Sequence, residues 1–217
     1  MTHPTDSIEF ASLLCSRLCH DLLSPVGALN NGLELMADET DPDMRQRCLD
    51  LLGDSARTSA NKLKFFRLAF GSAGGFGDGV PPHEARVAIE GMFAASGRVK
   101  LGWLVEEQMM GKLAVKVLLN LALIAGDALV RGGQLDIGAE VRADATEIVV
   151  RAEGPKVILD PDLRAALAGT LPAEGLGSRT AAAWMVRQLV SGAGGEIALS
   201  QAGEPVLLFG AVIPAQG

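Results

Sequence analysis

The N-terminal third of the chain has hydrophobic positions that recur every three or four residues, which is the spacing of an amphipathic helix. We expect a first helix to begin at Asp6, whose carboxylate caps the opening turn while Glu9 reaches back as in a capping box. A second helix is predicted to begin at Asp41, because aspartate caps free amides well and Pro42 suits the first helical position. Together the two helices form an antiparallel hairpin.

The apolar stripe along this hairpin is too wide for two helices to cover. It is predicted to include Leu14, Leu18, Leu22, Leu51 and Phe66. Pairing with a second copy of the chain would bury the stripe in a four-helix bundle, which is a common arrangement of such helices. The sequence therefore predicts a homodimer.

A glycine-rich segment, GSAGGFGDGVPP at residues 71–82, separates the hairpin from the rest of the chain. Glycine and paired prolines favour a flexible loop over a helix or strand. We therefore divide the chain into a helical hairpin over residues 1–72, which dimerises, and a second domain over residues 83–217.

The second domain alternates between helical and strand periodicity. In chain order we expect a helix at 85–95, a strand at 99–105, a helix at 113–130, paired strands at 135–141 and 146–152, helices beginning at 160 and 178, and a closing hairpin at 196–200 and 205–213. Helices packed on one face of a mixed or antiparallel sheet satisfy this order, so we expect an α/β sandwich. With the hairpin, the fold class is α+β.

Composition and charge exclude several classes of function. Acidic residues outnumber basic ones, 26 to 19, and no cluster of Lys or Arg is present that could follow a phosphate backbone. This excludes nucleic acid as a direct partner.

The N-terminus lacks the basic flank and apolar core of a signal peptide. The most apolar segment, Leu113–Val130, is interrupted by Lys116, Asn120 and Asp127, which suit the wet side of a helix better than lipid. We expect a cytoplasmic protein that binds no membrane.

Three cysteines, Cys15, Cys19 and Cys48, lie in apolar helical patterns and fit a reducing compartment better than a set of disulfides. We expect them to be small core residues. Cys15, Cys19 and His20 have ligand chemistry suited to zinc, but no fourth ligand stands at a matching spacing.

The segment HDLLSP at residues 20–25 carries the most specific candidate chemistry. A proline inside a helix costs about 3 kcal/mol, because it removes a hydrogen bond and clashes with the preceding turn. A bend just after His20 would expose its imidazole, which is a reason for Pro25 to be tolerated. The alternative is an ordinary surface histidine on an amphipathic helix.

This segment resembles the phospho-acceptor box of two-component histidine kinases, and the second domain resembles their ATP-binding domain with several residues replaced. Ile124 stands where such kinases have a magnesium-binding asparagine, and Ala152 stands where an aspartate recognises adenine. Gly175 and Gly177 match the last glycine box, while Ala173 replaces another of its glycines. Isoleucine and alanine offer neither an oxygen ligand for magnesium nor an acceptor for the adenine amino group.

An intact histidine box on a dimeric hairpin, joined to a degenerate histidine-kinase-like α/β sandwich of the Bergerat type, resembles the ChpT family of histidine phosphotransferases over nearly the whole chain. The resemblance implies that His20 accepts a phosphoryl group from the receiver domain of a hybrid histidine kinase and passes it to response-regulator receiver domains. It also implies that the chain binds no ATP and needs no cofactor, since the receiver supplies Mg²⁺. An ATP-dependent histidine kinase and a catalytically idle dimeric adaptor are the alternatives.

Four neighbours of His20 are candidates for a role beside it. Asp21 is expected to orient or stabilise the imidazole, although adjacent residues of a helix do not face one another. Arg17, three positions before His20, either attracts the phosphoryl group or is a solvated charge. Ser16 and Ser24, four positions to either side, are expected to border the same surface and to contact a partner.

Overall fold

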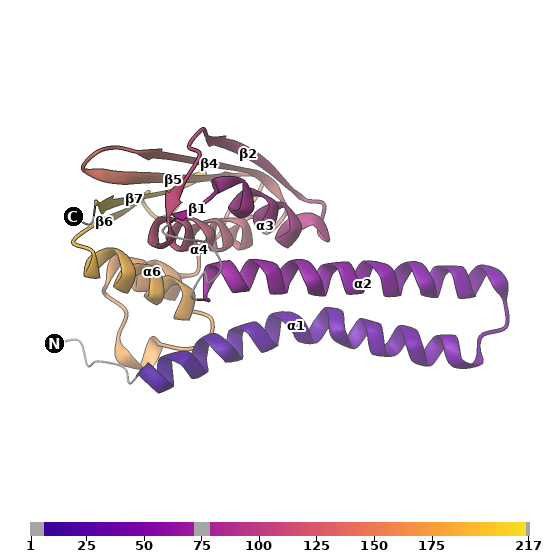
Figure 1. Cartoon of the computed structure of the whole chain (residues 1–217). Coiled ribbons are helices and arrows are strands. Elements are labelled where there is room, and N and C mark those ends of the chain that lie inside the picture. Colours follow the sequence, from indigo (N-terminus) through magenta and orange to yellow (C-terminus); the bar gives the residue numbers. More distant parts are fainter. Residues whose placement is uncertain (1–6, 72–78, 216–217) are drawn as a thin grey trace.

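The fold was analysed in a computed structural model, which describes residues 7–71 and 79–215. Two long antiparallel helices, α1 (Ser7–Asp38) and α2 (Pro42–Ala69), form the predicted hairpin (Figure 1). The Asp41 carboxylate accepts hydrogen bonds from the amides of Asp43 and Met44, so the predicted cap of α2 is confirmed. The predicted cap of α1 at Asp6 lies outside the described residues.

The second domain is built on a five-stranded mixed sheet in the order β2-β4-β5-β7-β6. Its strands are β2 (Val99–Val105), β4 (Gly133–Val141), β5 (Ala145–Glu153), β6 (Glu196–Leu199) and β7 (Val206–Pro214). The β2–β4 pair is parallel and the other pairs are antiparallel. This confirms the prediction of a mixed or antiparallel sheet.

The segment between the hairpin and the second domain is not entirely loop, as the sequence suggested. Its end forms a short strand, β1 (Gly79–Val80), which pairs with β3 (Met110–Gly111). The side chain of Val80 is buried in the core, and this apolar contact outweighs the local preference of a glycine- and proline-rich segment. Residues 72–78 lie outside the described part of the chain.

Helices cover one face of the sheet, and the hairpin packs against these helices from the other side (Figure 1). The helices are α3 (Pro82–Ala94), α4 (Lys112–Ala128), α5 (Pro161–Ala168) and α6 (Ala181–Gly192), with a short 3-10 helix at Ala173–Gly175. Each predicted element of the second domain is present, although helix α3 begins three residues earlier than expected and helix α6 begins three residues later. The predicted α+β class, with an α/β sandwich after a helical hairpin, is confirmed.

Helix α4 lies between the sheet and α2, and therefore nearly all of its sides are buried. Asn120, predicted on the wet side of this helix, is instead fully buried. Its side-chain amide donates hydrogen bonds to the carbonyls of Ala69, at 3.1 Å, and Lys116, at 2.8 Å, so it joins α4 to the end of α2. In the described part of the chain, no helix combines the length and apolarity needed to cross a bilayer.

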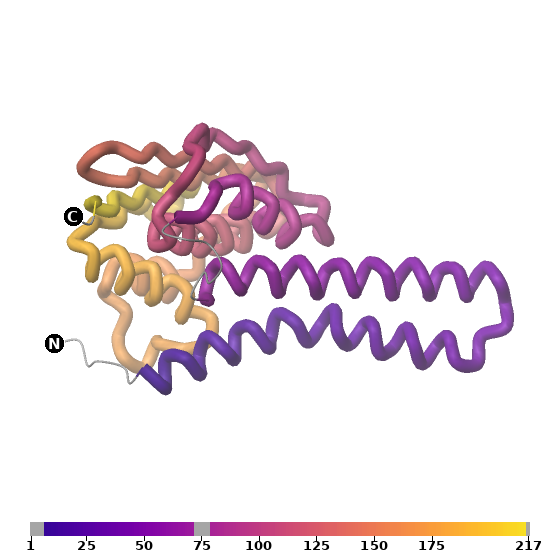
Figure 2. Tube along the Cα trace, in the orientation of Figure 1, coloured from indigo at the N-terminus to yellow at the C-terminus, as the bar shows by residue number. Residues whose placement is uncertain are grey.

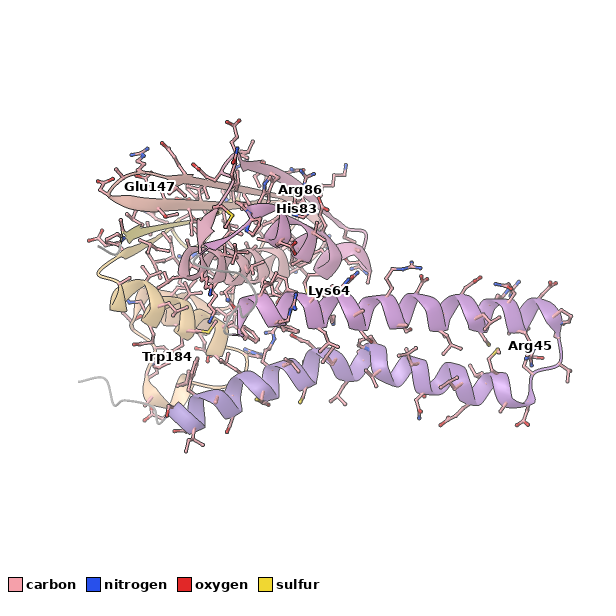
Figure 3. The ribbon with its side chains drawn as sticks, viewed as in Figure 1. Arg45, Lys64, His83, Arg86, Glu147 and Trp184 are labelled. Carbon is pink, nitrogen blue, oxygen red and sulfur yellow. The ribbon has the colours of Figure 1, made fainter. Side chains whose placement is uncertain are left out.

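The hydrophobic core continues from the second domain into the C-terminal part of α2. Phe66, predicted to belong to the uncovered stripe of the hairpin, is buried there and stacks on Phe70. On α1, Phe10 contacts Trp184 of α6, with 4.7 Å between ring centroids. Trp184 is labelled in Figure 3. The burial of Phe66 in this shared core and the contact of Phe10 with Trp184 attach the hairpin to the second domain.

Two of the three cysteines are exposed, although all three were expected in the core. Cys48 is buried as predicted, whereas Cys15 and Cys19 lie on the outer surface of α1. The apolar pattern around them indicated burial, but the second domain covers a different side of the helix. No group of three potential metal-ligating side chains is present among residues 7–71 and 79–215.

Candidate functional site

His20 lies on the surface of α1, and its side chain is 83% exposed, as the bend at the following proline predicts. Pro25 is inside α1 and is buried. Figure 2 shows that α1 bends near its middle, whereas α2 is nearly straight. The exposed imidazole is accessible to another protein without any movement of the fold.

The backbone carbonyl of Asp21 is the group that Pro25 leaves without a helical partner. In a regular helix the amide of residue 25 would donate to this carbonyl, but proline has no N–H. Instead, the Lys62 ammonium of α2 donates a hydrogen bond to the Asp21 carbonyl at 2.7 Å. Helix α2 therefore supplies the bond that the bent helix cannot make, which offsets part of the cost of the proline.

The Asp21 carboxylate lies between His20 and Arg17. Its Oδ1 is 3.3 Å from Nδ1 of His20, within reach of a hydrogen bond when that nitrogen carries the proton. Its Oδ2 accepts a hydrogen bond from Nε of Arg17 at 2.7 Å. His20 and Asp21, which are adjacent in the helix, thus come into contact. One oxygen of the Asp21 carboxylate is bound by Arg17, and the other faces His20. Nε2 of His20 has no hydrogen-bond partner among the described residues.

Arg17 is only 17% exposed and pairs with a second carboxylate, that of Asp127 in α4. Its Nη2 is 3.1 Å from Oδ2 of Asp127. Burial alone would lower the pKa of Arg17, but the hydrogen bonds and charges of Asp21 and Asp127 outweigh it and raise that pKa. The guanidinium is therefore neither a solvated charge nor a free one, and its predicted contact with a partner's phosphoryl group stays a prediction.

Asp127 is the member of this cluster that comes from the second domain. Its side chain is 48% exposed because it lines an open cleft, but protein surrounds it on the other sides. This partial loss of water raises the pKa of the Asp127 carboxyl, although Arg17 acts in the opposite direction. The attraction between Arg17 and Asp127 favours both charged forms, but for Asp127 the loss of water outweighs it.

A cleft of about 450 Å³ runs beside the histidine, between the hairpin and the second domain. Its lining includes Arg17, Asp21, Ser24, Lys62 and Asp127.

Ser16 and Ser24 are both exposed on α1, one turn to either side of His20. Their predicted contacts with a partner protein stay predictions.

The two residues expected from the sequence to replace those of a kinase nucleotide site lie in the core of the second domain. Ile124 of α4 is 4% exposed and Ala152 of β5 is fully buried. Both side chains pack in the same hydrophobic core and carry no oxygen or nitrogen. At these two positions the chain does not fit a magnesium–nucleotide complex bound as a kinase would bind it.

Sequence reasoning missed two residues of this site, Lys62 and Asp127. The need for a donor to the Asp21 carbonyl followed from Pro25, but its source, 41 residues along the chain, was set by the packing of α2 against α1. Asp127 stood out only as a polar interruption of an apolar helix. Its contact with Arg17, 110 residues away, had no local signal.

We expect Lys62→Met to lower the free energy of unfolding by about 1 to 2 kcal/mol, because the Asp21 carbonyl then loses its charged donor. Methionine keeps the aliphatic part of the side chain. Chemical denaturation at a fixed protein concentration measures the change.

The matched control for this variant is the same substitution combined with Pro25→Ala. Alanine restores an amide that donates to the Asp21 carbonyl, so Lys62→Met is then expected to cost much less. Equal costs with proline and with alanine at position 25 would contradict the role assigned to Lys62.

Comparison with known proteins found similarity over almost the whole chain. A family model described as the histidine phosphotransferase C-terminal domain matches residues 82–205. The protein phosphotransferase ChpT of Brucella abortus (strain 2308) is 32% identical over 202 residues, which cover 93% of this chain and 94% of that protein. The solved structure of a bacterial phosphotransferase superposes with a TM-score of 0.84 at 29% identity, over 96% of this chain and 98% of the other. The Acinetobacter baumannii histidine kinase AdeS aligns more weakly, with a TM-score of 0.48 at 15% identity, over 91% of this chain and 98% of the other.

Proposed function

Because the chain belongs to the histidine phosphotransferase family of ChpT, we propose that it carries phosphoryl groups between receiver domains on His20. The observation that carries the proposal is the exposed imidazole with Asp21 at Nδ1 and a free Nε2. In this function the donor is the receiver domain of a hybrid histidine kinase, and the acceptors are receiver domains of response regulators. Family membership itself supports phosphoryl transfer in two-component signalling.

The proposed transfer begins with neutral His20, protonated at Nδ1. The lone pair of Nε2 attacks the phosphorus of a receiver aspartyl phosphate, and the bond between phosphorus and the aspartyl oxygen breaks as the carboxylate leaves with its electron pair. The imidazole ring becomes positively charged when the N–P bond forms. Asp21 stabilises this charge through its contact with Nδ1, which is 3.3 Å away.

Onward transfer is the reverse step with another receiver. Its aspartate attacks the phosphorus, the N–P bond breaks, and the electron pair returns to Nε2. Because the transition state is loose, the main task of this chain is to place the nitrogen in line with the bond that breaks. The Mg²⁺ ion required for this chemistry belongs to the receiver in the proposed complex.

The dimeric form is part of the proposal. Outside the region packed on the second domain, the hairpin projects beyond the rest of the molecule (Figure 1). Large hydrophobic side chains are exposed along it, namely Leu23, Val26, Leu33, Leu35, Met44, Leu49, Leu51 and Leu63. A second copy that covers this surface, hereafter the hairpin stripe, would form the four-helix bundle.

We expect no binding of Mg·ATP at millimolar nucleotide. Each neutral polar group of the nucleotide left without a partner costs about 1 to 3 kcal/mol, and charged groups cost more. Ile124 leaves the magnesium ion without a protein ligand, and Ala152 leaves the adenine amino group without an acceptor. Isothermal calorimetry of the full chain with ATP and magnesium checks this, and micromolar magnesium-dependent affinity would favour the ATP-dependent kinase instead.

One experiment separates the three candidate functions. The chain is mixed with a receiver domain carrying labelled phosphate and, in a second reaction, with ATP labelled at the γ-phosphate. A phosphoryl carrier takes label from the receiver only, and a kinase takes it from ATP. An idle adaptor takes it from neither.

A further inference from the structure

We propose that Asp127, a residue of the second domain, is a positioning residue for phosphoryl transfer, since it holds Arg17 so that Asp21 remains on Nδ1 of His20. The inference rests on the proposed function of His20 and extends it across the interface with the second domain. Asp127 itself touches neither the imidazole nor the phosphoryl group.

Three successive contacts connect Asp127 to the histidine. Oδ2 of Asp127 is 3.1 Å from Nη2 of Arg17, and Nε of Arg17 is 2.7 Å from Oδ2 of Asp21. The other oxygen of Asp21 is 3.3 Å from Nδ1 of His20. Among the described residues, Arg17–Asp127 is the ion pair that joins the hairpin to the second domain.

The geometry of the guanidinium group explains why Asp127 matters. Nε and one terminal nitrogen of arginine form a planar fork that binds both oxygens of a single carboxylate. If Arg17 bound both oxygens of Asp21, the carboxylate would be held in the plane of the guanidinium group and could not turn one oxygen toward His20 independently. Instead, Asp127 accepts from Nη2, and Asp21 accepts from Nε through one oxygen only. The remaining oxygen is left for the imidazole.

The contact between Asp21 and His20 requires this support. Neighbouring residues of a helix project in different directions, so a carboxylate next to an exposed histidine does not turn toward it by default. An isolated ion pair within one helix is also weak. Anchoring Arg17 to α4, outside the hairpin, restricts its rotamers and those of Asp21. The second domain is thereby connected to His20 through Arg17 and Asp21.

The test compares Asp127→Asn with the unchanged full-length chain. We expect the rate of phosphoryl transfer from a labelled receiver domain to fall about five-fold. The ¹⁵N shifts of the His20 ring are expected to show less proton on Nδ1 and more on Nε2. A residue that serves only to stabilise the fold would leave this tautomer ratio unchanged.

Two further variants complete the design. Glu90→Gln is the matched control, because it removes one carboxylate from an exposed arginine pair within α3 and is expected to change neither measurement. In an Asp21→Asn background, Asp127→Asn is expected to have almost no additional effect on either measurement, since the chain of contacts is already broken.

The inference is overturned if Asp127→Asn keeps the tautomer ratio of the unchanged chain, or if it slows transfer equally with Asp21 and with Asn at position 21. The NMR measurement needs no phosphoryl donor. If the unchanged chain takes up no phosphoryl group, the proposed function fails, while the tautomer ratio still decides whether Asp127 positions Asp21.

Discussion

His20→Gln is expected to abolish phosphoryl uptake from a phosphorylated receiver while the fold and the proposed dimer remain intact. The side chain is 83% exposed and, among the described residues, its one hydrogen-bonding contact is with Asp21, so glutamine disturbs no core packing. The glutamine amide nitrogen has no available lone pair, because that pair is delocalised into the carbonyl, and it cannot serve as the nucleophile. Transfer of labelled phosphate from a receiver domain measures the loss.

The control is His83→Gln, which changes another exposed histidine beside an acidic neighbour, Glu84, on α3. This variant is expected to accept phosphate as the unchanged chain does. The adduct on the unchanged protein should be labile in acid and stable in base, as expected for a phosphoramidate. Label that persists in His20→Gln would show that another residue is the acceptor.

Leu51→Glu is expected to convert the proposed dimer into monomer or aggregate. Leu51 belongs to the hairpin stripe and is exposed in a single chain, so a charge there hardly disturbs the isolated fold. In a four-helix bundle the same position is buried, and apolar surface contributes about 25 cal/mol per Å² when it leaves water. A carboxylate at that position loses this contribution and adds a desolvation cost. Light scattering over a range of protein concentrations measures the change in mass.

Leu104→Glu provides the control, since Leu104 is exposed on β2, in the sheet and away from the hairpin. It is expected to leave the dimer unchanged. If the unmodified chain is already a monomer at micromolar concentration with its helices folded, the hairpin stripe has another purpose and the homodimer is wrong.

Local sequence determined the elements of this protein and the identity of its candidate nucleophile. Helical periodicity, the cap at Asp41 and the alternation of the later strands all act within a few residues, so each can be interpreted without knowledge of the fold. The sequence also predicted a bend at Pro25 and an exposed His20, and both residues lie in α1. The resemblance of residues 20–25 to a phospho-acceptor box, together with the residues that replace the nucleotide site, indicated the family.

Only the tertiary structure decided which side of each helix is covered and which distant charges meet. Phe66 and Asn120 are buried because the hairpin packs on α4, and Cys15 and Cys19 are exposed because that packing leaves their side of α1 open. Lys62 reaches the Asp21 carbonyl from 41 residues away, and Asp127 reaches Arg17 from 110 residues away. Such contacts depend on how whole helices dock. The free energy of docking is the sum of many weak van der Waals contacts, and the sequence around either residue does not show it. The sequence by itself therefore identified His20 as the candidate nucleophile. The docking of the second domain decided which residues contact Arg17, the neighbour of Asp21.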